Sequence, residues 1–82
     1  MINVDVYVPA LDEVTDFELD ESVTILQILN EMTEILSKRA REDMEKATDG
    51  FLLCLPKEER ILPLHLSLQM CGVKNGDRLM LL

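Results

Sequence analysis

The sequence predicts an α+β fold in which one main helix packs on one face of a mixed sheet of four to five strands. Near both ends of the chain, apolar residues alternate with polar or outward-facing ones at the two-residue period of a half-buried strand. Between these segments, apolar residues recur at the three- and four-residue steps of an amphipathic helix. At 82 residues, 48% of them hydrophobic, the chain should form a single domain, 1–82, with a core of its own.

The first two strands are predicted from alternation. Residues 2–8 place aliphatic side chains at every second position, so one face of this strand should be buried and the other polar. Pro9 cannot donate to a strand ladder and should end the segment. Residues 15–20 alternate in the same way. The two segments should therefore pair as an antiparallel hairpin.

The helix has a clear start signal. Thr24 suits the N-cap, and Gln27 follows at the three-residue spacing of a capping box. A polar segment, residues 37–49, follows the apolar part of the helix and is either an extension of it or a loop, with Gly50 as a stop signal. The sequence leaves both alternatives open. The predicted apolar stripe consists of Ile25, Ile28, Leu29, Met32, Ile35 and Leu36.

The remaining strands lie in the second half of the chain. Residues 51–55 are wholly apolar and predict a central strand, whereas residues 60–64 predict a weak strand that Pro63 places at an edge. Residues 75–77, Asn-Gly-Asp, predict a turn before a last strand at 78–82. With one helix on one face, the first and last strands can lie parallel at the centre of the sheet.

Charge and targeting signals limit the classes of partner. The net charge of −8 argues against nucleic acid and anionic lipid, because both require a basic surface. Nine of the 16 acidic residues fall within residues 1–37, where no lysine or arginine occurs. These acids form either a solvated face or a surface that attracts a basic protein. Since neither a secretory signal nor a stretch of ~20 apolar residues is visible, we expect a cytoplasmic protein without membrane insertion, unless a targeting segment has been removed.

No residue pattern predicts catalysis, a cofactor or a metal site. Cys71 with His65 would resemble a nucleophile and its base, but no third orienting group accompanies them, and a buried structural cysteine is the simpler interpretation. Cys54 lies inside an apolar strand and is read as structural. With one histidine and no glycine-rich phosphate loop, we expect no enzyme.

The predicted interaction site lies on the free face of the sheet. If Leu79 and Leu81 point at the helix, the side chains between and after them must point the other way. Residues 51–55 should likewise expose every second side chain. Such an apolar patch could bind a partner protein, could form a homodimer, or could be covered by the polar segment. The predicted partner-binding residues are Leu52, Cys54, Met80 and Leu82.

The order of the elements resembles ubiquitin, which implies a β-grasp (ubiquitin-like) fold. Six residues of the second strand and helix align with ubiquitin without a gap: Phe17, Leu19, Thr24, Ile25, Ile28 and Met32. Residues 68–79, LQMCGVKNGDRL, are similar to the YukD/EsaB family of ubiquitin-like proteins. In that family a cysteine-glycine pair is followed by a β-branched residue and then by Asn-Gly-Asp-Arg-Leu leading into the final strand. The long polar segment departs from the family pattern.

This resemblance implies a cytoplasmic accessory or regulatory component of the bacterial type VII secretion system, which exports WXG-type substrates. Its partner would be a membrane-embedded component of that machinery, and the acidic charge of residues 1–37 favours a basic surface on that partner. The alternative is a ubiquitin-like modifier or a sulfur carrier. These proteins act through a flexible tail that ends in two glycines, whereas this sequence ends at Leu82 within its last strand, so the alternative is disfavoured.

Overall fold

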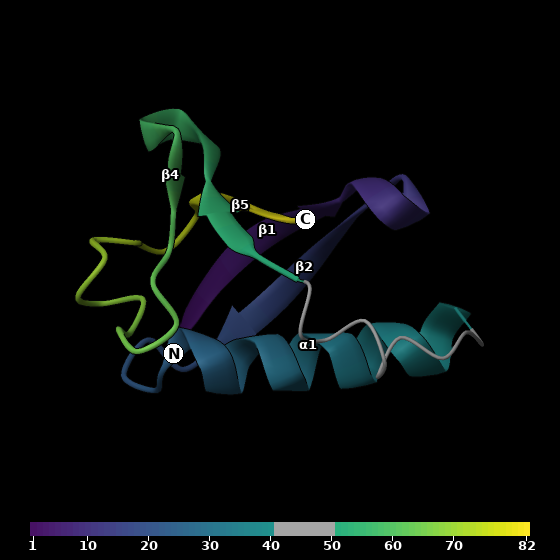
Figure 1. The fold of residues 1–82 in the computed structure, drawn as a ribbon, viewed down its shortest axis with the longest axis horizontal. Helices are drawn as coiled ribbons and strands as arrows, with labels where there is room; N and C mark the ends of the chain where they lie inside the picture. Colours follow the sequence, from purple (N-terminus) through teal and green to yellow (C-terminus); the bar gives the residue numbers. More distant parts are fainter. Residues whose placement is uncertain (41–50) are drawn as a thin grey trace.

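The computed structural model describes residues 1–40 and 51–82. The helix α1 (Ile25–Ala40) covers one face of a five-stranded mixed sheet with the strand order β2-β1-β5-β3-β4 (Figure 1). The predicted fold class, one helix on a mixed sheet, is therefore confirmed. The strands are β1 (Ile2–Val8), β2 (Glu13–Leu19), β3 (Leu53–Leu55), β4 (Arg60–Ile61) and β5 (Arg78–Leu81).

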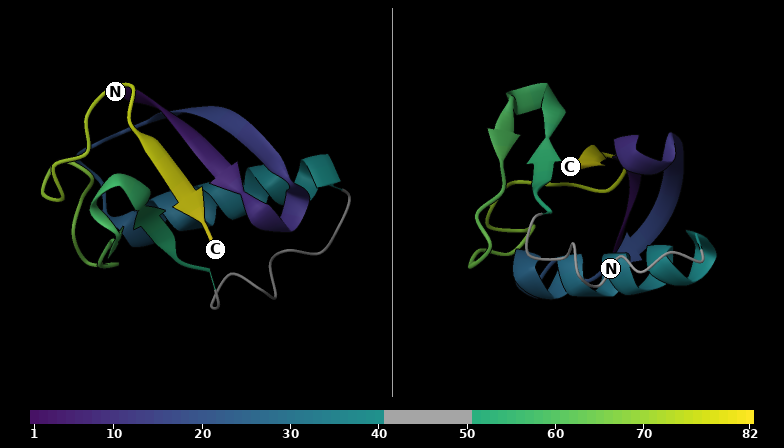
Figure 2. Two further views of the ribbon diagram at one scale, coloured as in Figure 1. Left: turned by 90° about the horizontal axis from the view of Figure 1, so that it is seen from above. Right: turned by 45° about the vertical axis from the view of Figure 1, so that its right-hand side comes forward.

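The two ends of the chain meet at the centre of the sheet. β1 and β5 run parallel, with Val6 opposite Leu79, and they lie side by side above α1 in the left view of Figure 2. β1 also pairs antiparallel with β2 over its whole length. The predicted hairpin and the predicted parallel pairing of the first and last strands are both present.

Two short turns of the same construction connect the hairpins. Each is a 3-10 turn that begins with proline, η1 (Pro9–Leu11) and η3 (Pro56–Glu58). The residues that follow, Asp12 and Glu59, adopt the left-handed conformation with φ of 51° and 50°. Each of these two residues donates its N–H to the carbonyl of the proline that starts its turn. The strands leave such a turn in opposite directions, which allows antiparallel pairing.

Three strand boundaries differ from the prediction by two residues or more, and β2 and β5 each end one residue before the predicted end. β2 begins at Glu13, before the predicted start at residue 15, because the η1 turn is complete at Asp12. β3 begins at Leu53 and not at residue 51, and it lies one strand away from the edge of the sheet. β4 is the edge strand, as predicted, but it ends at Ile61, two residues before the proline that cannot donate to a ladder.

The helix begins as predicted and buries most of the predicted stripe. The Gln27 N–H donates to the Thr24 hydroxyl oxygen at 3.2 Å, which is the N-cap hydrogen bond. The prediction that Ile35 is buried is wrong, because 46% of this residue is exposed. It lies at one margin of the helix face that packs on the sheet. Thr33 lies at the other margin and is buried, and its hydroxyl donates to the carbonyl of Leu29 at 2.9 Å.

The helix continues beyond its apolar part. Residues 37–40 belong to α1, so the start of the polar segment is helical. The question of helix or loop for residues 41–49, and the stop signal at Gly50, lie outside the described residues.

The Asn-Gly-Asp turn ties β1 to the start of β5. The Asn75 side-chain oxygen accepts the Asn3 N–H at 2.8 Å, and Gly76 donates its own N–H to the Asn3 carbonyl at 2.7 Å. The Asp5 N–H donates to the Asp77 carbonyl at 3.1 Å. Gly76 has a φ of 89°, which favours glycine. These residues therefore set the register of the central parallel pair.

We expect Ile28→Ala to lower the free energy of unfolding by about 2–5 kcal/mol, because the side chain is fully buried and its loss leaves a cavity. Urea denaturation followed by circular dichroism measures this change. Ile35→Ala is the matched control on the same helix and should cost much less, since Ile35 is partly exposed. Equal losses for the two variants would contradict the observed helix face.

We expect Asp77→Asn to destabilise the fold at neutral pH by about 1.5 kcal/mol, through the loss of charge-assisted hydrogen bonds. The Asp77 carboxylate accepts the Lys74 N–H and the Lys57 ammonium, both at 2.9 Å, and these two contacts lower the pKa of its carboxyl group. A lowered folded-state pKa contributes stability above the unfolded-state pKa, and this stability is lost as the pH falls through the folded-state value. The difference between the two proteins in urea denaturation should therefore close in acid, and a constant difference would contradict the prediction.

Candidate interaction surface

The sheet has an outer face, opposite α1, and the predicted partner-binding residues lie on it. β5 buries Leu79 and Leu81 against the helix and turns Met80 outward, where it is half-buried. Leu82 follows β5 and is 50% exposed. On the neighbouring strand, Leu53 and Leu55 are buried, Cys54 is half-buried, and Leu52 just before the strand is 40% exposed. A role for these residues in binding stays a prediction.

The four predicted residues form two neighbouring cross-strand pairs. Cys54 lies opposite Met80 in the antiparallel register of β3 and β5. Leu52 and Leu82 exchange two backbone hydrogen bonds, both of 2.8 Å. Because side chains of directly opposed residues lie on the same face of a sheet, all four meet on the outer face.

The same face holds three apolar residues that sequence reasoning missed. Tyr7 lies opposite both Met80 and Val14, and Ile61 lies opposite Cys54. Val14 and Ile61 are about half exposed. Alternation in β1 indicated that Tyr7 faces outward, but its apolar neighbours come from the register of other strands. The resulting apolar row crosses all five strands and consists of Val14, Tyr7, Met80, Cys54 and Ile61.

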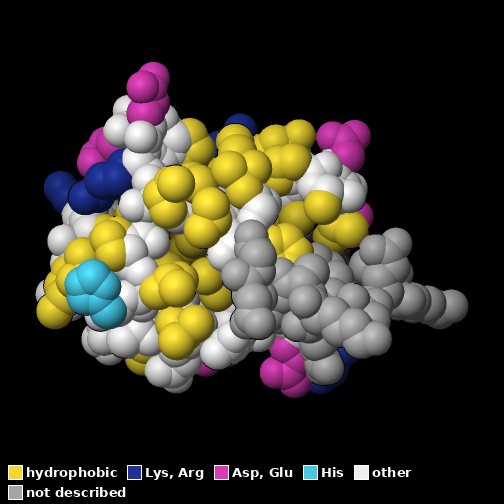
Figure 3. All heavy atoms as spheres, in the orientation of Figure 1, with side chains coloured by type: hydrophobic (Ala, Val, Ile, Leu, Met, Phe, Trp, Pro, Cys, Tyr) yellow, Lys and Arg dark blue, Asp and Glu magenta, His cyan; other side chains and the backbone are white. Residues whose placement is uncertain are grey.

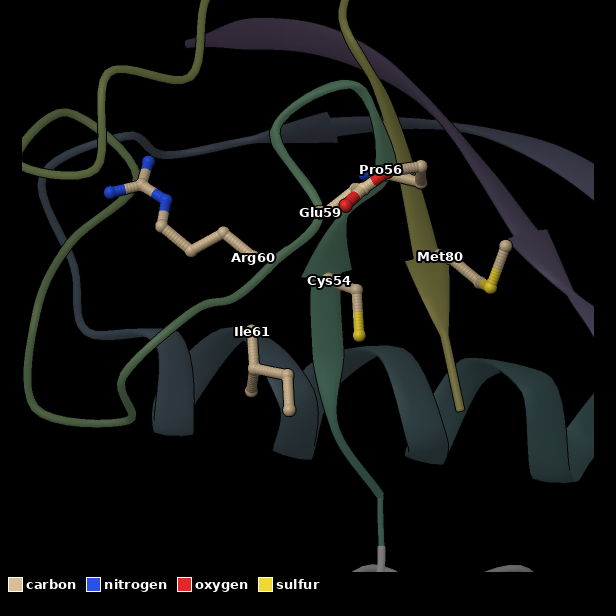
Figure 4. Close-up of a pocket in the computed structure, with 6 residues that line it drawn as sticks. All are labelled: Cys54, Pro56, Glu59, Arg60, Ile61 and Met80. Atoms are coloured by element: carbon tan, nitrogen blue, oxygen red, sulfur yellow. The ribbon is translucent and has the colours of Figure 1, made fainter.

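A shallow pocket lies at the β3–β4 end of the apolar row. Its volume is about 280 Å³, which suits one large side chain. In Figure 4, the Arg60 side chain extends away from Cys54, and its guanidinium donates to the Cys71 carbonyl. Burial raises the pKa of the Cys54 thiol, so this group stays neutral and the pocket remains apolar. The pocket is lined by Cys54, Pro56, Glu59, Arg60, Ile61 and Met80.

A broad apolar surface is visible on one face of the molecule. Figure 3 views the molecule in the orientation of Figure 1, and apolar side chains gather over its upper and central parts. Acidic side chains stand mainly at the margins of this view. Leu52 and Leu82 extend the apolar row along the strands, and together with the row they are called the outer patch below.

Two carboxylates border the apolar row on β1 and β2. Asp5 and Asp16 are directly opposite in the register, two residues along their strands from Tyr7 and Val14. A hydrogen bond to Asp5 and the like charge of that residue raise the pKa of the Asp16 carboxyl group. Within residues 1–40 and 51–82, neither carboxylate forms an ion pair with a lysine or arginine. Arg78 lies opposite Asp5 on β5 without pairing with it.

The groups considered for catalysis do not assemble into a site. Cys71 is 3% exposed and packs in the hydrophobic core, while His65 is exposed. In the described part of the chain, no three His, Cys, Asp or Glu side chains are grouped so that they could hold a metal ion. The described helix is also too short and too polar to cross a bilayer.

Comparison with known proteins identifies the family. A family model described as "WXG100 protein secretion system (Wss), protein YukD" matches residues 1–81. The chain belongs to the YukD family. The resemblance of residues 68–79 to this family is thereby confirmed, and the family ties the protein to the WXG100 secretion system. No curated protein sequence matches this YukD-family chain.

Solved structures confirm the ubiquitin-like fold of this YukD-family protein. The N-terminal ubiquitin-like domain of the 4931431F19Rik protein superimposes with a TM-score of 0.72 at 20% identity, covering 99% of this chain and 72% of that one. The UBL domain of Plasmodium falciparum Dsk2 gives a TM-score of 0.70 at 19% identity, with coverages of 98% and 93%. At such identities the likeness concerns the fold alone.

We expect Asp16→Asn to stabilise the protein at neutral pH, because it removes a charge that repels Asp5. A carboxyl group whose folded-state pKa is raised destabilises the fold above that pKa, and the effect is relieved as the pH falls through it. The gain should therefore disappear in acid, which urea denaturation over a pH series measures. Asp20→Asn is the control, and it should lower the stability at neutral pH, because hydrogen bonds from Ser22 lower the pKa of Asp20. A gain for Asp16→Asn that is independent of pH would contradict this account.

Proposed function

We propose that this YukD-family protein is a non-catalytic interaction module that acts in the cytoplasm as an accessory or regulatory component of a bacterial type VII secretion system. It binds a protein component of the secretion machinery through the outer patch. The observation that carries the proposal is the apolar row, which crosses all five strands on the face that α1 leaves open.

The apolar row is not needed to complete the core. The helix already covers the inner face, where Val4, Val6, Leu79 and Leu81 are nearly fully buried. A sheet with one solvated face usually carries polar side chains there, because exposed apolar surface is unfavourable in water. Contiguous apolar patches on small proteins commonly mark interaction sites. The outer patch therefore supports binding as its function.

The chemistry of the outer patch supports a non-catalytic role. The Cys54 thiol, the strongest potential nucleophile of the outer patch, has a raised pKa and therefore little thiolate at neutral pH. Among the residues that line the pocket, Glu59 and Arg60 are the ionisable neighbours, and Arg60 is engaged with Glu58 and with the Cys71 carbonyl. The pocket can hold an apolar side chain, but it offers no nucleophile with its base.

We expect Met80→Glu and Leu82→Glu to abolish partner binding and to reduce export of the WXG100 substrate, because each places a charge in the outer patch. Leu26→Glu is the matched control: Leu26 is 49% exposed, close to the 50% of Leu82, but it lies on α1. Export is measured in a deletion strain that carries each variant. Binding is measured by isothermal titration with purified cytoplasmic parts of the secretion membrane proteins, and circular dichroism verifies folding.

Normal export and binding with either patch variant, in folded protein, would contradict the proposal. Sedimentation equilibrium tests the homodimer that could use the same patch. A dimer that Met80→Glu converts to monomer, together with unchanged export, would assign the outer patch to self-association and remove it from the proposed function.

A further inference from the structure

We infer that the partner presents an apolar side chain flanked by an arginine or lysine, with the apolar group in the pocket beside Met80 and the cation over the Asp5–Asp16 pair. This inference rests on the proposed function and specifies the chemistry of the partner's docking segment. It is carried by the position of two opposed carboxylates next to the apolar row, neither of which forms an ion pair with a lysine or arginine among the described residues.

The two carboxylates are placed where a docked segment would reach them. Asp5 and Tyr7 are two residues apart on β1, which corresponds to about 7 Å along a strand. Asp16 and Val14 have the same spacing on β2. Asp5 is half-buried and Asp16 exposed, so both share the outer face with the apolar row. A segment lying on the row therefore passes within a side chain's length of both carboxylates.

The pair is electrostatically unfavourable in the free protein. Like charges directly opposite in an antiparallel ladder destabilise it. Arg78 is the neighbouring cation in the register, yet it makes no ion pair with Asp5 within the described residues. The pKa of Asp16 is raised by a hydrogen bond to Asp5 and, after it, by the like charge of Asp5. A cation brought by a partner would relieve this repulsion at neutral pH, as protonation relieves it in acid.

An arginine of the partner supplies a positive charge to the Asp5–Asp16 pair. Its planar guanidinium can donate to both carboxylates at once, and a charge-assisted contact is stronger than a neutral hydrogen bond. Because the pair repels itself before binding, the cation gains both the new contacts and the relief of repulsion. Acidic partners, nucleic acid and anionic lipid would meet the opposite effect at the same place.

A second copy of this chain is a poorer occupant than a basic partner. Each copy carries a net charge of −8, so bringing two together is opposed by long-range repulsion. The same outer face would also bring a second Asp5–Asp16 pair into the interface. A protein segment with a basic side chain matches the charge that the face presents.

The test is a selection of random 12-residue peptides displayed on phage against three immobilised proteins: the wild type, Asp16→Asn and Met80→Glu. The wild type should enrich peptides that combine a large apolar residue with a lysine or arginine at a constant spacing. Asp16→Asn should retain the apolar residue and lose the preference for the cation. Met80→Glu should enrich neither.

Binding of synthetic versions of the enriched peptides then measures the coupling energy between the peptide's cation and the Asp16 carboxylate. Replacing the peptide's cation by glutamine should weaken binding to the wild type about tenfold, and it should change binding to Asp16→Asn much less. Glu18→Gln is the control of equal charge, because Glu18 lies on the same strand opposite Asn3, farther from the apolar row. It should preserve most of the tenfold effect.

The outcomes separate this inference from the proposed function. Apolar peptides without a cation, bound by the wild type and lost with Met80→Glu, would overturn the inference and leave the outer patch as a docking site. The same peptides bound by Met80→Glu would overturn both. An empty selection, or a wild-type dimer that occupies the patch at assay concentration, would also overturn the inference.

Discussion

The parallel pairing of β1 with β5 is the constraint on which the rest of the structure depends. It joins segments from opposite ends of the chain, with Val6 opposite Leu79, and the Asn-Gly-Asp turn holds its register through Asn3. With β1 and β5 in the centre, β2 and the β3–β4 hairpin can only add at the two sides. The helix then covers the inner face of the sheet, where β1 and β5 supply fully buried side chains. The contacts are far apart in sequence, so their loop-closure entropy must be offset by this shared core.

The same pairing creates the candidate site. Strand alternation sends Met80 outward as soon as Leu79 and Leu81 face the helix, and the register places Tyr7 on one side of it and Cys54 on the other. The protein therefore exposes apolar surface at the centre of its sheet, where water would favour polar groups. Such surface gains free energy when a partner covers it, which links the fold directly to the proposed binding function.

Local signals predicted much of the fold, and their failures have physical causes. The cap at Thr24 and the alternation of residues 2–8 depend on neighbours within a few residues, so the sequence was sufficient for both. The prediction for Ile35 failed because this residue lies at a margin of the apolar arc, and only the placement of the helix on the sheet decides which margin is covered. For the site, Met80 and Leu82 followed from alternation, whereas Ile61 required the register of β3 with β4.

The sequence by itself determined the kind of fold, the helix start, the Asn-Gly-Asp turn before β5, and the family. Each of these depends on residues close together in the chain or on a contiguous motif. Only the tertiary structure decided which residues of different strands become neighbours on the outer face. Tyr7, Val14 and Ile61 become neighbours of the predicted residues through strand pairing, as Asp5 and Asp16 become neighbours of each other. Strand register is a property of paired backbones, and a shift of one residue would have turned every one of these side chains to the opposite face.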